Sequence, residues 1–292
     1  MIVVTAAAGQ TGMAVVRALR SRSVAVRAVV GRDVPRPELT ALGAEVAVGD
    51  LREPSSVAPL LADTEALYLI WPNVDPAEAV GAQALLDAAQ LMALPRVVYH
   101  SVLRPQARSM PHHAAKDQVE EALDRSDLAW RVLQPCAYAD NLDRQFAEAA
   151  VTGLFRSPWG PERAQSLVDL RDVGEAAAVL LTENGLDGGT FEAAGPEPLT
   201  ACDIATRFTV ALGREVTAVD AVPDGPVPPL DGTDQAYAAH CLRRMFDHYR
   251  AHGFIGTPRV LEALLDRRPR TFTEHLAGQL PGLRTPGAGA QS

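Results

Sequence analysis

Short apolar runs alternate with amphipathic stretches along the first 135 residues of the chain. Six of these runs have the length and the β-branched character of buried strands, and the segments between them carry apolar residues at helical spacing. The expected strands are 2–5, 24–30, 45–48, 66–70, 96–100 and 130–133. The expected helices are 12–21, 37–42, 55–61, 76–92 and 116–125. This alternation predicts an α/β fold, a doubly wound parallel sheet covered by helices on both faces.

After Pro135 the strand–helix rhythm changes. Helices are expected at 142–152, 173–182, 234–252 and 258–265, with a strand at 189–193. Thr200 is expected to cap a helix that ends at Leu212, and four prolines between 223 and 232 predict a loop or flap. We therefore predict a sheet domain over 1–135, onto which later segments fold back, and a smaller α+β domain over 136–280. A disordered tail is expected over 281–292.

The turn after the first expected strand has the composition of a dinucleotide-binding loop. Residues 5–12 have the sequence Thr-Ala-Ala-Ala-Gly-Gln-Thr-Gly and lead directly into a helix. Small residues let the backbone approach a pyrophosphate, and a helix N-terminus offers free N–H groups with a positive dipole end. The predicted cofactor residues here are Gly9, Gln10, Thr11 and Gly12, which makes the first domain a Rossmann domain. Ala6 occupies a position where the fingerprint usually has glycine, and a plain tight turn is the alternative interpretation.

The cofactor's ribose should lie at the end of the second strand, about 20 residues further on. Arg32 and Asp33 stand there. The Arg32 guanidinium would hold a 2′-phosphate and favour NADPH, whereas Asp33 would accept a hydrogen bond from a free 2′-hydroxyl and favour NADH. We predict NADPH or NADP⁺ as the cofactor, with NADH the second choice and solvated loop charges the structural alternative.

Two further strand ends carry candidate cofactor contacts. At the end of the third strand, Asp50 would accept a hydrogen bond from the adenine amine and Leu51 would pack on the ring. The alternative for Asp50 is a helix N-cap. At the end of the fourth strand, Trp71 and Pro72 would flank the path of the cofactor, with core packing as the alternative.

Composition narrows the functional classes. A formal net charge of -9 argues against a nucleic-acid partner, because such proteins usually carry a basic patch. The 3 cysteines are scattered without a CxxC pair, so we expect a reducing compartment, no disulfide framework and no metal site. No apolar run approaches the roughly 18 residues of a membrane span, and the N-terminus enters a strand at once. We expect a soluble cytoplasmic protein with no membrane partner.

Many short segments of the chain, in the right order, resemble NmrA-like proteins, a branch of the atypical short-chain dehydrogenases. The segments that carry the resemblance are 98–103, 111–116, 119–121, 130–135, Tyr138, 141–142, 167–173, 194–200 and 248–253. The resemblance implies a Rossmann domain that binds NADP(H) and a C-terminal domain that forms one wall of the substrate cleft. Some members of this family reduce quinones, ketones or phenolic substrates, and others sense NADP(H) and regulate partners.

Ordinary short-chain dehydrogenases use a Ser, a Tyr and a Lys four residues after the Tyr, so that Tyr and Lys share one helix face. In this chain Ser101 follows the fifth strand and Lys116 opens the next expected helix, but His112 occupies the position four before Lys116. By resemblance Lys116 would hold the ribose hydroxyls, with a solvated helix lysine as the alternative. Ser101 would contact cofactor or substrate, or serve only as a turn residue.

The missing Tyr leaves the proton donor open. His112 and His113 are candidates because imidazole titrates near neutrality, and a surface or capping role is their alternative. Protonation by water or substrate is the other option. Tyr138 and Asn141 follow the sixth strand, where nicotinamide and substrate would meet, and Trp159 would begin the second domain's share of the cleft.

These observations predict an NADPH-dependent reductase of a small carbonyl, enone or quinone-like substrate. One alternative is a non-catalytic NADP(H) sensor with a protein partner, which the missing Tyr favours. Another is an isomerase or cyclase that keeps its cofactor. The sequence leaves the assembly open, a homodimer included.

Overall fold

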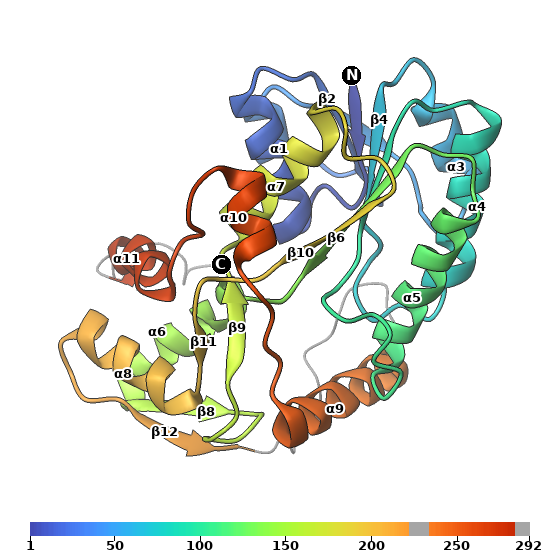
Figure 1. Cartoon of the computed structure of the whole chain (residues 1–292). Coiled ribbons are helices and arrows are strands. Elements are labelled where there is room, and N and C mark those ends of the chain that lie inside the picture. Colours follow the sequence, from blue (N-terminus) through green and yellow to red (C-terminus); the bar gives the residue numbers. More distant parts are fainter. Residues whose placement is uncertain (222–233, 284–292) are drawn as a thin grey trace.

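The computed structural model describes residues 1–221 and 234–283. Its centre is a seven-stranded sheet with the order β10-β6-β5-β4-β1-β2-β3, in which every pair of neighbours is parallel (Figure 1). The strands are β1 (Ile2–Val4), β2 (Val26–Val30), β3 (Glu45–Val48), β4 (Ala66–Leu69), β5 (Val97–His100), β6 (Trp130–Pro135) and β10 (Gly189–Ala193). The strand order reverses between β1 and β4, so the predicted doubly wound sheet is confirmed.

Helices cover both faces of this sheet. One face carries α1 (Gln10–Ser21), α2 (Pro37–Ala41), α7 (Leu170–Thr182) and α10 (Arg259–Leu265). The other carries α3 (Pro54–Val57), the short 3₁₀ helix η1 (Ala58–Leu61), α4 (Glu78–Leu91) and α5 (Pro111–Asp124) (Figure 1). The helices α1 and α7 pack closely because Gly174 lacks a side chain: a Cβ there would lie 2.6 Å from the carbonyl oxygen of Ala14.

The two faces of the sheet hold separate hydrophobic cores because side chains alternate along each strand. On β1, Val3 packs toward α4 and α5, whereas its neighbour Val4 packs toward α1 and α7. All residues of β1, β4 and β5 are buried, as expected of parallel strands covered on both sides.

The remaining elements build a smaller unit beside the carboxyl ends of the strands (Figure 1). Its strands are β7 (Ala137–Tyr138), β8 (Leu154–Ser157), β9 (Gln165–Val168), β11 (Pro198–Leu199) and β12 (Thr217–Asp220). Its helices are η2 (Ala139–Leu142), α6 (Asp143–Thr152), α8 (Ala201–Leu212), α9 (Gln235–His252) and α11 (Phe272–Leu283). Thr200 caps α8 as predicted: its hydroxyl accepts a hydrogen bond from the Asp203 N–H, 3.1 Å away, and the Asp203 carboxylate accepts one from the Thr200 N–H.

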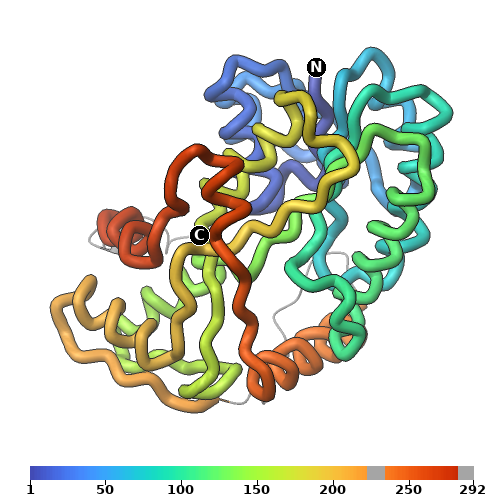
Figure 2. Tube along the Cα trace, in the orientation of Figure 1, coloured from blue at the N-terminus to red at the C-terminus, as the bar shows by residue number. Residues whose placement is uncertain are grey.

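The chain passes between the two parts more than once, as the tube in Figure 2 shows. After α7 it returns to the sheet as β10, and α10 packs against α7 and β10 before α11 returns to the smaller unit. The domain boundary at residue 135 stays a prediction.

Two irregular segments were expected, a tail over 281–292 and a flap over 223–232. The expected tail begins too early, because Pro281 to Leu283 form the end of α11; residues 284–292 lie outside the described part of the chain. The flap predicted at 223–232 also lies outside the described residues. No helix in the described ranges combines the length and apolar character that a membrane crossing needs.

Candidate active site

A cavity of about 390 Å³ lies at the carboxyl ends of the central strands, within the range usual for small-molecule sites. Its walls come from the loops after β1, β4, β5 and β6 and from the smaller unit. The residues that the sequence predicts and that line this cavity are Gly9, Gln10, Thr11, Gly12, Trp71, Pro72, Ser101, His112, His113, Lys116, Tyr138, Asn141 and Trp159. Three predicted cofactor residues, Arg32, Asp50 and Leu51, do not line it.

The loop after β1 has the shape that a pyrophosphate needs. Ala6 adopts a left-handed backbone with φ 47, the conformation that glycine usually supplies at this position. Gly12 is required by close packing, because a Cβ there would lie 2.6 Å from the Ala6 carbonyl oxygen. Among the described residues no side chain caps α1 at Gly9, and its first turn has no acidic residue. The first N–H groups of α1 are therefore suited to a phosphate.

Lys116 is buried, which rules out the alternative of a solvated helix lysine. Its side chain is 7% exposed, and its ammonium lies 2.7 Å from Glu78 Oε1. The ammonium also donates to the carbonyl oxygen of His100 at 3.3 Å, and the Tyr99 hydroxyl donates to the same Glu78 carboxylate at 2.7 Å. Glu78 thus fixes the lysine at the wall of the cavity. No local sequence pattern predicts this pairing, because Glu78 stands 38 residues before Lys116, within another expected helix.

Ser101 is held by a carboxylate rather than by a turn. Its hydroxyl donates a hydrogen bond to Glu120, and the Gln134 amide donates to both oxygens of the same carboxylate at 2.9 Å. Burial raises the pKa of Glu120, and the hydrogen bonds from Ser101 and Gln134 offset part of that rise. Ser101 therefore lines the cavity, but its hydroxyl proton is already donated to Glu120.

His112 and His113 are buried side chains, so their expected surface or capping role is wrong. Burial lowers the pKa of His112 to about 3 and that of His113 to about 4, with Lys116 adding to both shifts. Both rings are therefore neutral at physiological pH. The expectation that they titrate near neutrality is not met, whereas their role as proton donors stays a prediction.

A hydrogen-bonded chain of side chains lies where the sequence analysis left the proton donor open. His100 Nδ1 is 2.7 Å from the Tyr68 hydroxyl, and His100 Nε2 is 2.7 Å from the Tyr138 hydroxyl. The Thr11 hydroxyl donates to Tyr138 at 3.5 Å, which joins the chain to the start of α1. The sequence feature that could have identified His100 as a site residue is its position at the end of β5, next to β4, which carries Tyr68.

Burial sets the protonation of this chain. It lowers the pKa of His100 to about 3 and raises the pKa of Tyr138 to about 12. It also raises the pKa of Tyr68 well above its usual value. At neutral pH the chain therefore consists of two phenols and one neutral imidazole.

Three predicted cofactor residues lie at the ends of β2 and β3, outside the cavity wall. Arg32 is exposed just beyond β2. Asp50 accepts a hydrogen bond from the Arg52 N–H at 3.0 Å, a local turn; the alternative of a helix N-cap is wrong, since Glu53 precedes α3. Leu51 is buried in the core between the sheet and α4. Their roles toward a cofactor stay predictions.

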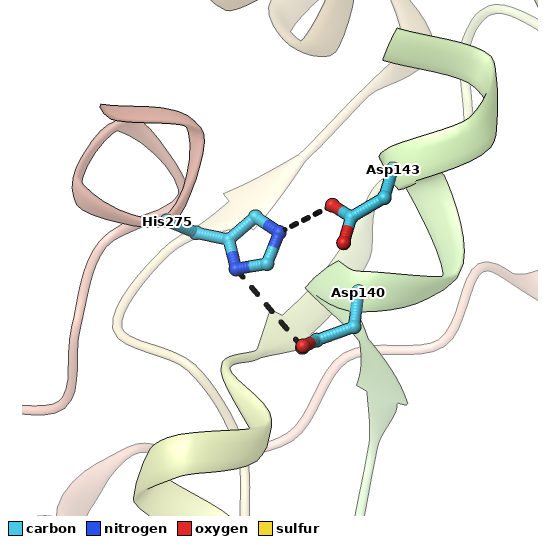
Figure 3. Close-up of side chains that lie close together, drawn as sticks. All are labelled: Asp140, Asp143 and His275. Carbon is cyan, nitrogen blue, oxygen red and sulfur yellow. Dashed lines mark hydrogen bonds and ion pairs between the residues drawn. The ribbon is translucent and has the colours of Figure 1, made fainter. Parts of the chain in front are cut away.

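A second cluster of polar side chains, none of which lines the cavity, joins α11 to η2 and α6 (Figure 3). His275 Nε2 is 2.7 Å from Asp143, and its Nδ1 is 3.1 Å from Asp169 and 4.0 Å from Asp140. Asp140, Asp143 and His275 are close enough to share a metal ion. However, both ring nitrogens already face carboxylates, so a protonated His275 supplies the positive charge that this cluster needs.

The pKa of His275 reflects that arrangement. Burial alone would lower it, but the hydrogen bonds to Asp143 and Asp169 and the charge of Asp140 outweigh burial and raise it to about 9. His275 is therefore a cation at neutral pH, and no motif or spacing in the sequence predicts this.

The fold and the loop after β1 define a dinucleotide-binding class of protein. The match to the NmrA-like family covers residues 1–254, and the chain belongs to that family.

Relatives with known activities resemble the chain over most of its length. An NAD(P)H azoreductase from Xenophilus azovorans is 28% identical over 224 residues, which cover 75% of this chain and 76% of that protein. An NADPH-dependent quinone oxidoreductase from Escherichia coli, solved with NADPH, superposes with a TM-score of 0.82 at 22% identity, over 96% of this chain and 100% of that one. NmrA, a negative transcriptional regulator solved with NAD, superposes with a TM-score of 0.77 at 18% identity, over 96% and 95%. The fold therefore serves both enzymes and a regulator.

Proposed function

We propose that the protein is an NADPH-dependent reductase of a small conjugated carbonyl or quinone-like substrate. The observation that carries the proposal is the cavity wall, where a loop suited to a phosphate, a buried lysine and a half-buried phenol lie together. The relatives that reduce azo compounds and quinones with NAD(P)H support the reaction class. When bound, the reduced nicotinamide supplies the hydride.

The residues at the N-terminal side of the cavity are suited to hold the cofactor. The first turn of α1 would take the pyrophosphate, and Arg32 at the end of β2 would take the 2′-phosphate. Lys116, fixed by Glu78, would donate to the ribose hydroxyls at the cavity wall. Of the three ammonium protons, two are engaged by Glu78 and by the His100 carbonyl oxygen, and the third stays available for a ribose hydroxyl.

Tyr138 takes the role of proton donor in this proposal. Its hydroxyl lies between Thr11 of the phosphate loop and His100, and its side chain lines the cavity. In the tautomer with the proton on Nε2, Tyr68 donates to His100 and His100 donates to the Tyr138 oxygen. The Tyr138 proton is then free for the substrate oxygen, and the His100 N–H stabilises the phenolate that remains.

His112, His113, Asn141 and Trp159 belong to the substrate side of the cavity in this proposal. The two histidines are neutral, so they contribute shape and hydrogen bonds rather than protons. The division into a cofactor domain over 1–135 and a substrate domain over 136–280 follows the same assignment.

Turnover with menadione as the quinone tests the proposal. The wild-type protein should oxidise NADPH only when menadione is present, and Tyr138→Phe should lower kcat while NADPH still binds. Tyr237→Phe is the matched control, because Tyr237 lies on α9 and does not line the cavity. No oxidation with menadione or a panel of enones and aldehydes would contradict the proposal.

The alternative function is a cofactor sensor, and the NmrA regulator solved with NAD favours it. The same experiment separates the two, because a sensor binds NADPH without oxidising it under any substrate. Substrate conversion without net NADPH oxidation would instead indicate an isomerase or cyclase.

A further inference from the structure

The substrate side of the cavity holds buried polar atoms that have no partner within the described residues. They include both amide atoms of Gln165, Nε2 of His113 and the indole N–H of Trp159, besides Nδ1 of His112 and Oε1 of Gln145. Gln165 is 1% exposed, His113 is 0% exposed and Trp159 is 6% exposed, and all three line the cavity. Buried polar groups in folded proteins almost always have partners, so a cluster of exceptions on one cavity wall needs an explanation.

The hydrogen-bonding role of each group is fixed by its chemistry. His113 Nδ1 lies 3.1 Å from the carbonyl oxygen of Arg104, which can only accept. Because the ring is neutral, Nδ1 carries its one proton and Nε2 is left as a bare acceptor. The Trp159 indole is a donor only, and the Gln165 amide offers one donor group and one acceptor.

These groups sit on a rigid aromatic support. Phe254 forms a β-bridge with Gln165, and its ring lies edge-on to His113 at 5.8 Å between centroids. Tyr249, which also lines the cavity, stacks on Phe254 at 4.7 Å. Phe254 therefore contacts the His113 ring with its side chain and the Gln165 strand with its backbone.

The charge of the wall limits the ligand. Among the described residues that line the cavity, Lys116 carries the one full charge, and it is paired with Glu78. Apolar side chains such as Leu142, Met245 and Phe246 complete the substrate side. A carboxylate or phosphate would find no unpaired cation there, whereas a flat neutral molecule would be well covered.

We propose that His113, Gln165 and Trp159 form a subsite for a neutral polar substituent that carries both a donor and an acceptor, such as a carboxamide or a hydroxyl beside a carbonyl. The substituent's N–H or O–H donates to His113 or to the Gln165 oxygen, and its carbonyl accepts from Trp159 or from the Gln165 amide. The inference rests on the proposed function, since it takes this cavity as the substrate's. It adds that the preferred substrate is a conjugated compound that carries such a group, which menadione lacks.

Three probes of nearly equal shape test the subsite: naphthamide, acetonaphthone and isopropenylnaphthalene, each substituted at the same ring position. Naphthamide offers a donor and an acceptor, acetonaphthone an acceptor only, and isopropenylnaphthalene neither. Each is titrated calorimetrically into the full-length protein saturated with NADP⁺. We expect affinity to fall about tenfold at each step of this series, the loss expected for one buried hydrogen bond.

Variants assign the preference to individual residues. Gln165→Met should reduce the preference for naphthamide over isopropenylnaphthalene about tenfold and leave the affinity for isopropenylnaphthalene unchanged. His113→Asn keeps a donor for the Arg104 carbonyl, but its shorter side chain has no acceptor at the position of Nε2. It should therefore erase only the preference for naphthamide over acetonaphthone. Gln118→Met, the same change as at Gln165 on the exposed face of α5, is the control and should alter nothing.

Equal affinity of the wild-type protein for all three probes would overturn the inference, as would a Gln165→Met variant that weakens all three alike. The binding experiment needs no turnover, so its outcome is independent of the reductase proposal. If the protein reduces menadione but binds the three probes equally well, the proposed subsite is contradicted and the reductase proposal stands. If the protein shows the probe preference but oxidises NADPH with no substrate, the reductase proposal is contradicted and the subsite stands.

Discussion

Buried histidines lie in two regions of this molecule, the cavity and the cluster around α11. The charged groups around them differ in sign between the two regions. In the cavity, His100, His112 and His113 lie near Lys116, and burial holds their pKa values at about 3 to 4. At α11, His275 lies among three carboxylates, and hydrogen bonds overcome burial to raise its pKa to about 9. The first group is neutral and the second is a cation.

The polar groups of the two regions also differ in how completely they are paired. Around α11 each charge meets its opposite: Asp169 accepts from Arg171 and His275, and the buried Asp172 accepts from Arg267 and Arg270. Along the cavity, several buried polar atoms have no partner in the described residues. A region that satisfies its own charges stabilises the fold, whereas one that leaves polar atoms unpaired is suited to a ligand.

The largest expected effect is on catalytic activity and concerns the cavity alone. Tyr138→Phe removes one hydroxyl from the cavity and should lower kcat with menadione about 100- to 1000-fold, the usual contribution of a positioned general acid. The free energy of unfolding should change little, and Tyr237→Phe should leave kcat unaltered. A Tyr138→Phe variant with wild-type kcat would show that the proton comes from elsewhere.

The second effect is on stability and belongs to α11. His275→Gln removes the cation from among Asp140, Asp143 and Asp169 and should lower the free energy of unfolding by about 2–3 kcal/mol at neutral pH. Because the pKa of His275 is raised to about 9, this stabilisation is complete below about pH 6.5 and is lost as the pH rises through 9. Denaturant unfolding at several pH values measures it. A deficit that persists unchanged at pH 10 would contradict the charge-based account.

The cavity histidines should show the opposite pH dependence. They are neutral in the folded protein and take up protons on unfolding, so stability is complete above about pH 6.5 and falls as the pH drops toward 4. Each contributes a slope of about 1 kcal/mol per pH unit in that range. His113→Asn should reduce the slope, and His240→Asn, at an exposed position of α9, is the control. Equal slopes in both variants would mean that His113 titrates normally.

The smallest expected effect concerns the choice of cofactor. Arg32→Ala should weaken NADPH binding about tenfold and leave NADH binding unchanged, because only NADPH carries the 2′-phosphate. Calorimetric titration with both cofactors measures the ratio. If both affinities fall together, Arg32 acts on a part of the cofactor that the two share.

Local signals in the sequence predicted the frame of the molecule but not its side-chain pairings. The apolar strands, the small residues of the loop before Gly12 and the Thr200 cap are each encoded within a few neighbouring positions. Strands such as β7 and β11 are only two residues long, too short for any periodicity to show.

The chemistry of the site depends on contacts between distant elements. Glu78 reaches Lys116 from α4, and Tyr68 and Tyr138 reach His100 from β4 and β7. The helix α5, which carries His112 and His113, packs against α9, and the ring of His113 lies against Phe254, more than a hundred residues further along the chain. The same holds for His275, whose three carboxylates lie far earlier in the sequence. A pattern within a short stretch of sequence cannot predict contacts between residues that lie so far apart in the chain.

The measurement that tests the central claim most directly is calorimetric titration of NADPH into the wild-type protein and the Lys116→Met variant. The account predicts micromolar binding by the wild-type protein and at least a tenfold loss in the variant, because Lys116 would donate to the cofactor ribose. Circular dichroism and thermal unfolding of the variant confirm that it is folded. Failure of the wild-type protein to bind NADPH would contradict the assignment of this cavity to a reductase.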